Sequence, residues 1–122
     1  MLAPVIPILT DGDIEKVLEA ARQAGASFAA MGLLRLSGAV HELFAQWLEE
    51  HAPPSARRCL TKVAQTAGSS VAESLQGQGP YAHMLQQRFA LACRRLGFGT
   101  APELRLDLFR RPGNGQQLEL FE

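Results

Sequence analysis

The chain has 122 residues, of which 47% are hydrophobic, and twelve basic side chains balance twelve acidic ones, so we expect one domain with a modest core. The balanced charge predicts no bulk attraction to nucleic acid or to a membrane surface, and the apolar runs are far shorter than the ~20 residues of a membrane span. No secretory signal is expected, because Met1 leads directly into a proline-interrupted segment. Cys59 and Cys93 lie far apart and fit a reducing compartment, so we expect a cytoplasmic protein.

Residues 2–36 are predicted to form a strand, a helix and a second strand. The apolar run 2–7 contains two prolines and suits the beginning of a strand, and Thr10 and Asp11 are residue types that start helices. The run 27–36 is almost unbroken in its apolar character, as in a strand buried on both faces. Between the two runs lies an apolar stripe at helical spacing that ends at a glycine: Ile14, Val17, Leu18, Ala21, Gly25. Because parallel strands need covering helices and further strands beside them, this unit is expected to belong to a larger sheet.

Two helices are predicted for the middle of the chain. The first begins at residue 37 or 38 and ends at the prolines of 51–54, since the residue before a proline avoids the helical region. Its apolar stripe comprises Val40, Leu43, Phe44, Trp47 and Leu48. The second helix is expected over 56–66, with Ser55 as its cap. In this helix Leu60 and Val63 are expected to face inward, and Arg57, Arg58 and Lys62 outward.

A loop and one long helix are expected next. The segment 67–79 is small and polar and is interpreted as a loop, and Pro80 is well placed to begin a helix that Gly97 ends. The stripe of this helix comprises Tyr81, Leu85, Phe89, Ala92 and Leu96. Apolar and charged residues alternate over 103–109, which weakly indicates an edge strand or an extended segment, and the glycines and proline of 112–115 interrupt regular structure.

Four segments of the chain carry a family resemblance: APVIP (3–7), TDGDIEKVLEAARQAGA (10–26), LLRLSGAVHELFAQWLEEHAP (33–53) and GQGPYAHMLQQRFALACRRLGF (77–98). In this order they resemble the C-terminal portion of radical-SAM proteins of the spore-photoproduct-lyase-like group, which are often labelled DNA repair photolyases. The chain also ends with a similar QL-x-LF sequence, at 117–121. Members of that family are partial (β/α) barrels in which an early Cys-x3-Cys-x2-Cys loop binds a [4Fe–4S] cluster and S-adenosylmethionine.

The resemblance implies an α/β fold with three parts. Residues 1–36 would be a βαβ unit from the late part of a partial (β/α) barrel, with strands at 2–6 and 28–36. Residues 37–111 would be a mainly helical C-terminal extension, and 112–122 a flexible tail. Such a unit would complete the barrel wall and help to shape the substrate pocket. Its expected partner is the missing N-terminal barrel half or, through uncovered strand edges, a second copy of itself.

The chain departs from the family in two respects. The three-cysteine motif is missing, and Cys59 and Cys93 cannot replace it because such a cluster needs at least three closely placed thiolates. The segment 66–79, which tends to be basic and glycine-rich in the family, carries only one charged residue, Glu73. We therefore expect the chain to be catalytically inert on its own, and weak in any nucleic-acid contact through this segment.

Arg35 is the candidate substrate-binding residue. It is the one charged residue of the second predicted strand, and a charge there is costly unless it is paired or faces a cavity. In a barrel, a side chain near the carboxyl end of a strand lies where ligands bind. Arg35 would then contact a carboxylate or phosphate of a substrate or cofactor. The alternative is a structural salt bridge with an acidic residue such as Glu42.

Other residues give weaker indications of chemistry. The histidines and cysteines show none of the spacings of a metal site, and no catalytic triad or carboxylate pair is evident. The turn 77–80 has the glycines of a phosphate-binding loop, but it lacks the strand before it and the lysine after it, which favours a plain helix start. A nucleic-acid patch is an alternative for five arginines together with Tyr81 or Phe98: Arg88, Arg94, Arg95, Arg110 and Arg111.

The tail contains a recognisable peptide motif. Gln117, Leu118, Glu119, Leu120 and Phe121 resemble the pentapeptide with which bacterial proteins bind the sliding clamp. In that interpretation Gln117 occupies a polar subsite, while Leu118, Leu120 and Phe121 enter an apolar groove. The alternative is a terminal strand whose leucines pack on the parent fold. The motif makes a small, non-enzymatic clamp-binding module the rival of the radical-SAM hypothesis.

Overall fold

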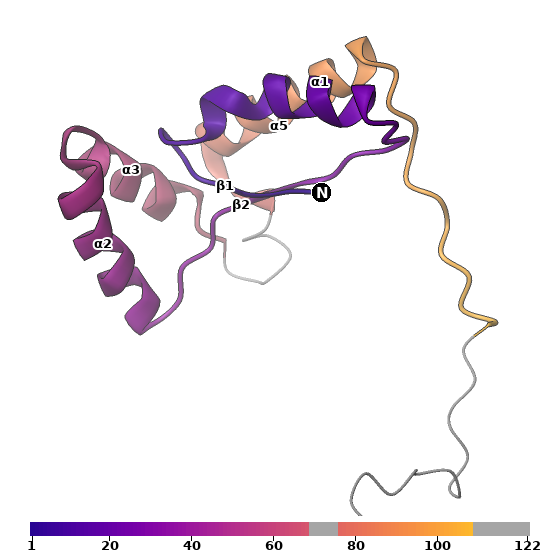
Figure 1. The fold of residues 1–122 in the computed structure, drawn as a ribbon. Coiled ribbons are helices and arrows are strands. Elements are labelled where there is room, and N and C mark those ends of the chain that lie inside the picture. Colours follow the sequence, from indigo (N-terminus) through magenta and orange to yellow (C-terminus); the bar gives the residue numbers. More distant parts are fainter. Residues whose placement is uncertain (69–75, 109–122) are drawn as a thin grey trace, which may run out of the picture.

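Two short parallel strands lie at the centre of the molecule in a computed structural model, which describes residues 1–68 and 76–108. The strands are β1 (Leu2–Val5) and β2 (Met31–Leu33), and they are joined by a 3-10 turn, η1 (Asp11–Asp13), and by α1 (Ile14–Gln23). The later helices are α2 (Ala39–His51), α3 (Pro53–Thr66) and α5 (Gly79–Arg95). The predicted fold class, α/β with a βαβ unit followed by helices, is confirmed. Figure 1 shows α1 and α5 along one side of the strands, and α2 and α3 beyond their carboxyl ends.

The parallel pairing of β1 and β2 is as the sequence predicted, but the second strand is much shorter. Leu2 pairs with Met31 and Val5 with Leu33, with an irregularity in register between them. The strand predicted over 28–36 is wrong in its extent, since β2 covers only Met31–Leu33. Before it, Phe28 forms an isolated parallel bridge with Gly99, which lies four residues beyond the end of α5 at Arg95. Each strand therefore has one strand neighbour within the described part of the chain.

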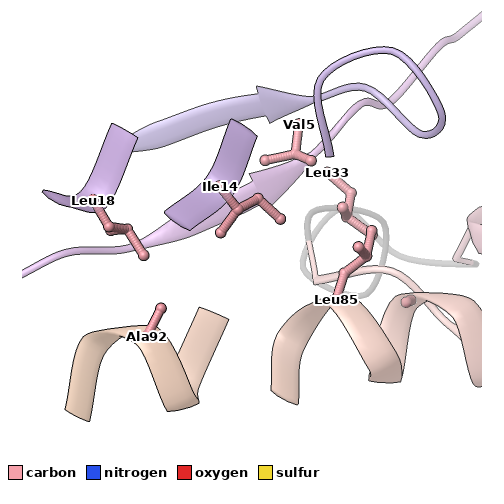
Figure 2. Packing of buried hydrophobic residues seen from close by; sticks show 7 residues of the cluster. Val5, Ile14, Leu18, Leu33, Leu85 and Ala92 are labelled. Carbon is pink, nitrogen blue, oxygen red and sulfur yellow. The ribbon is translucent and has the colours of Figure 1, made fainter. Parts of the chain in front are cut away.

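The main core fills the space between the strands and the helices α1 and α5. Figure 2 shows its side chains converging from all of these elements. The buried members are Val5, Ile14, Leu18, Leu33, Ala82, Leu85 and Ala92. The stripe predicted for α5 is confirmed, because Leu85 and Ala92 are buried and its other members pack against this cluster. The stripe predicted for α1 is confirmed at Ile14 and Leu18, whereas Val17 is exposed.

A second core lies at the carboxyl ends of the strands, where the α2–α3 hairpin packs. Its buried members are Leu48, Ala56, Cys59 and Val63, with Ile6, Leu34 and Phe44 among the residues packed against them. The stripe predicted for α2 is wrong as a core face. Only Leu48 is fully buried, while the side chains of Val40, Leu43 and Trp47 are 53%, 64% and 46% exposed. These three side chains stay largely exposed although α2 packs against α3, and the Trp47 ring stacks on Phe44 of the same helix, with 6.0 Å between the ring centroids.

The start predicted for the second middle helix is wrong. Ser55 does not cap the third helix, because α3 begins at Pro53 with Ala52 as its cap. Proline fits the first turn of a helix, where its missing N–H has no partner to lose, so the Pro53–Pro54 pair both ends α2 and begins α3.

The edge strand predicted over 103–109 is absent from residues 103–108, while residue 109 lies outside the described part. In this segment Arg105 pairs with Asp107 at 2.6 Å, and Leu104, Leu106 and Leu108 are all exposed.

Candidate binding sites at the carboxyl ends of the strands

A cavity of about 290 Å³ lies just beyond the carboxyl end of β2. It is formed between the segment that leaves β2, the first turn of α2 and the last turn of α3. Its walls are mostly apolar, with Arg35, Ser37 and His41 as the side chains that carry polar groups. The lining residues are Leu34, Arg35, Leu36, Ser37, His41, Val63, Ala64, Ala67 and Gly68. The candidate Arg35 thus lies next to a cavity, two residues beyond the carboxyl end of the parallel strand β2.

Arg35 differs from the prediction in its environment. It is exposed rather than buried within a strand, because β2 ends at Leu33. The alternative salt bridge with Glu42 does not form, and within residues 1–68 and 76–108 the Arg35 side chain has no ion pair or hydrogen bond. Among residues 1–68 and 76–108, no acidic side chain lines the cavity. A guanidinium that has no ion pair among these residues and lies beside an apolar wall suits a small organic anion, since arginine binds carboxylate and phosphate through paired hydrogen bonds.

Two carboxylates of α1, Glu15 and Glu19, form ion pairs with Arg88 and Arg95 of α5. The Arg88 guanidinium donates two hydrogen bonds to the Glu15 carboxylate, at 3.0 and 2.8 Å, and a third to the backbone oxygen of Asp11 at 3.2 Å. Arg95 donates to Glu19 at 2.8 Å. The hydrogen bonds with Arg88 lower the pKa of Glu15, and the same bonds raise the pKa of Arg88. Two members of the predicted arginine patch, Arg88 and Arg95, thus pair with carboxylates of α1, and the nucleic-acid patch stays a prediction.

The remaining residues of the predicted arginine patch have different environments. Arg94 is exposed on α5, whereas Arg110 and Arg111 lie outside the described residues. Of the two aromatic residues expected beside the patch, Phe98 lies under the guanidinium of Arg22, 5.7 Å from it, and Tyr81 donates its hydroxyl proton to Asp11. Burial and the hydrogen bond to Asp11 raise the pKa of Tyr81 to about 12. Both rings therefore take part in contacts within the fold.

A second cavity, of about 390 Å³, lies beside the turn that follows β1. It is lined by Ile8 of that turn and by four residues of α3: Arg57, Arg58, Thr61 and Lys62. Sequence reasoning placed these three cations outward but did not identify a site. The available signal was the composition of α3, which has three cations and no acidic residue among its 14 residues. The cavity itself depends on the contact between α3 and the turn after β1, which sequence spacing does not reveal.

The two cysteines do not fit an iron–sulfur cluster. Cys59 is fully buried in the second core and Cys93 is partly buried beside the first, so the two thiols belong to different clusters. Burial raises the pKa of both thiols, and in the case of Cys59 the charge of Asp11 adds to this effect. The described residues also contain no group of three or more metal-ligating side chains. A [4Fe–4S] cluster needs at least three thiolates, and this sequence has two.

The turn before α5 is held by contacts with its neighbours. The backbone N–H of Gln78 donates to the oxygen of Thr66 at 3.1 Å, and the Gln86 side chain donates to the oxygen of Gln76 at 2.6 Å. Gly79 and Pro80 form the first turn of α5. The Gln78 N–H is therefore not free to bind a phosphate, in agreement with a plain helix start.

Comparison of the chain with models of protein families, with curated proteins and with solved structures found no match. Among the helices that the structure describes, none is long and apolar enough to cross a membrane. The candidate clamp-binding residues Gln117, Leu118, Leu120 and Phe121 lie outside the described residues.

Proposed function

We propose that this chain is the C-terminal part of a cytoplasmic radical-SAM protein of the spore-photoproduct-lyase-like group. The support is the co-linear resemblance of four segments between residues 3 and 98, together with a βαβ unit followed by helices. In this proposal the chain completes the wall of a partial (β/α) barrel and shapes its substrate pocket. The cluster and S-adenosylmethionine belong to the N-terminal half, and the chain alone is inert.

The observation that carries the proposal is the parallel two-stranded sheet. Parallel strands normally lie within larger sheets that are covered on both faces, and an unpaired strand edge is a template for pairing with another strand. Here β1 and β2 have only each other as strand neighbours in the part of the chain that the structure describes. Val17 of α1 and Phe28, just before β2, are both 44% exposed although they belong to the βαβ unit. Further strands and helices of a barrel would cover such surfaces.

Arg35 is the residue of this chain that we assign to ligand binding. Its guanidinium is exposed beside the cavity at the carboxyl end of β2, and barrel enzymes bind their ligands at this end of the strands. We assign it the role of holding a carboxylate or phosphate of the substrate or cofactor in the completed barrel.

Reconstitution tests this proposal. The chain is mixed under anaerobic conditions with a separately produced N-terminal half of a full-length family member that carries its iron–sulfur cluster. We expect a one-to-one complex by light scattering and slower amide exchange at the outer edges of β1 and β2. We also expect cleavage of S-adenosylmethionine that depends on the chain. If there is no complex and amide exchange is unchanged, the proposal is wrong. Protection at the same edges through dimerisation of the chain alone would instead identify self-association as the use of these edges.

The tail supports a second proposal, in which the protein is a non-enzymatic module that binds the bacterial sliding clamp. The supporting observation is the sequence 117–121, QLELF, after a segment (100–108) that contributes no buried side chain. Burial of each large apolar side chain in a groove contributes about 1.5–3 kcal/mol before ordering costs.

Binding of the full chain to a purified bacterial clamp tests this second proposal. We expect binding that is abolished by replacing both Leu120 and Phe121 with alanine. The matched control replaces Leu104 and Leu106, which are exposed in the described segment before the tail. Absence of binding at ~100 μM chain, a concentration that would reveal even a weak complex, rejects the idea.

A further inference from the structure

The turn after β1 has a strained backbone next to the 390 Å³ cavity. Ile8 has a φ of +70°, a conformation that is rare for a β-branched side chain. Two hydrogen bonds hold the turn in place: the Ile6 N–H donates to the Thr10 hydroxyl at 2.8 Å, and the Thr10 N–H donates to the Ile6 oxygen at 3.0 Å. Such strain concentrates at functional sites, and the carboxyl end of a parallel strand is where α/β proteins bind ligands.

The opposite wall of the cavity is a cationic face of α3 whose arginines have no ion pair with any acidic residue of the described part of the chain. Arg58 and Lys62 are one helical turn apart, so that their like charges repel each other. The guanidinium groups of Arg57 and Arg58 have no ion pair or hydrogen bond within the described ranges. Lys62 donates to the Gln65 side chain at 3.1 Å and lies 5.0 Å from the centre of the Tyr81 ring.

Asp11, the acidic residue whose charge acts on α3, already accepts hydrogen bonds from other residues. Asp11 raises the pKa of Cys59 on α3, which places its charge near this helix. Its carboxylate accepts the hydrogen bond of Tyr81, and its backbone oxygen accepts a hydrogen bond from Arg88. Asp11 therefore does not form an ion pair with Arg57, Arg58 or Lys62.

We propose that this cavity binds the phosphate group of a small phosphorylated molecule, with Arg57, Arg58 and Lys62 around the phosphate and Ile8 against the organic part. Three cations match a phosphate monoester, which carries a charge of about −2 and three strong acceptor oxygens. Guanidinium groups bind such oxygens in pairs. The volume is at the lower end of the range of ~300–1,000 Å³ that is usual for small-molecule sites. The site is separate from Arg35 and the strand edges, so it does not depend on the radical-SAM proposal.

Titration calorimetry on the full chain tests the site with adenosine 5′-monophosphate, phenyl phosphate, inorganic phosphate and uncharged adenosine as probes. At low ionic strength we expect the two monoesters to bind with a Kd of ~1 mM or tighter, and inorganic phosphate to bind more weakly because it leaves Ile8 uncovered. Adenosine should not bind. Replacement of both Arg57 and Arg58 with glutamine should weaken monoester binding at least tenfold. The matched control, Lys16→Gln together with Arg94→Gln, also removes two positive charges but outside the cavity, and should leave monoester binding unchanged.

Three results would overturn the proposal. The first is no heat of binding with any phosphorylated probe at ~10 mM. The second is an equal loss of affinity in the control, which would show that binding follows net charge rather than this cavity. The third is tighter binding of a single-stranded oligothymidylate than of either monoester, which would assign the cations to a nucleic-acid backbone. Circular dichroism of each variant verifies that the fold is retained.

Discussion

Gly77 occupies a position where both backbone and space require glycine. Its φ is +78°, and a Cβ there would lie 2.4 Å from Cδ1 of the buried Leu33 and 2.9 Å from Cβ of Ala82. The residue thus allows the turn before α5 to approach β2 closely. In the sequence, Gly77 is recognisable only as part of a glycine-rich turn. Its actual role depends on a contact with β2, more than 40 residues away in the chain.

Gly77→Ala should therefore destabilise the fold by about 2–4 kcal/mol, because a left-handed backbone and an overpacked core add their costs. Gly25→Ala is the matched control. Gly25 has a φ of +92° but nothing within 4 Å of a Cβ, so only the backbone cost of about 1–2 kcal/mol remains. Urea denaturation measures both. Equal losses in the two variants would show that Gly77 is not sterically required.

The ion pair of Glu15 and Arg88 predicts a dependence of stability on pH. Arg88 lowers the pKa of Glu15 in the folded state below its ordinary value of 4.5. A depressed carboxyl pKa stabilises the fold above the unfolded-state pKa, and this contribution is lost as the pH falls through the folded-state pKa. Because the side chains are 34% and 32% exposed, we expect no more than ~1 kcal/mol.

Urea denaturation between pH 6 and pH 3 measures this contribution. The native protein should lose stability relative to the variant Glu15→Gln as the pH falls below about 4.5. Glu50→Gln, at an exposed carboxylate near the end of α2, is the control and should follow the native protein. Parallel curves for the native protein and Glu15→Gln would exclude a stabilising role for the pair.

At the scale of elements, periodicity predicted which helices and strands exist better than which of their faces are covered. The βαβ order, the stripe of α5 and the left-handed glycines 25 and 97 all follow from local rules, and the structure agrees. The stripe of α2 is equally regular, but burial depends on a partner surface that a local pattern cannot reveal. The same reason explains why β2 is shorter than its apolar run, since pairing with β1 decides where a strand ends.

The candidate sites were likewise only partly predictable from the sequence. The position of Arg35 near the carboxyl end of a strand was predictable from the sequence, whereas the end of β2 at Leu33 and the lack of an ion pair with any described residue were not. The pairing of Arg88 with Glu15 joins residues that are 73 positions apart, and no spacing rule reaches that far. The cationic cavity of α3 also requires Ile8 to meet a helix about 50 residues later. Contacts of this kind arise from tertiary packing alone.

The buried and exposed apolar residues of α2 should differ in how much they contribute to stability. Leu48 is fully buried and Leu43 is 64% exposed on the same helix. Leu48→Ala should destabilise the chain by about 2–5 kcal/mol because it leaves a cavity in the second core. Leu43→Ala should change stability by less than about 0.5 kcal/mol, as at other exposed positions. Thermal unfolding measures both, and a large loss in Leu43→Ala would show that this face is covered.

At the scale of the whole molecule, the two cores lie on different parts of one small parallel sheet. The first core joins the strands to α1 and α5, and the second joins their carboxyl ends to α2 and α3. Both cavities lie at these carboxyl ends, one beside each strand. Both proposed ligand sites therefore lie at the end of the sheet where a barrel would bind its substrate.

The iron and acid-labile sulfide content of the natural gene product, purified from its source cells with whatever it is bound to, tests the central claim most directly. The radical-SAM proposal predicts about four iron and four sulfide per copy of this sequence, carried on a longer polypeptide or on a bound partner. A product of 13.2 kDa that contains neither iron nor sulfide and has no partner would contradict it.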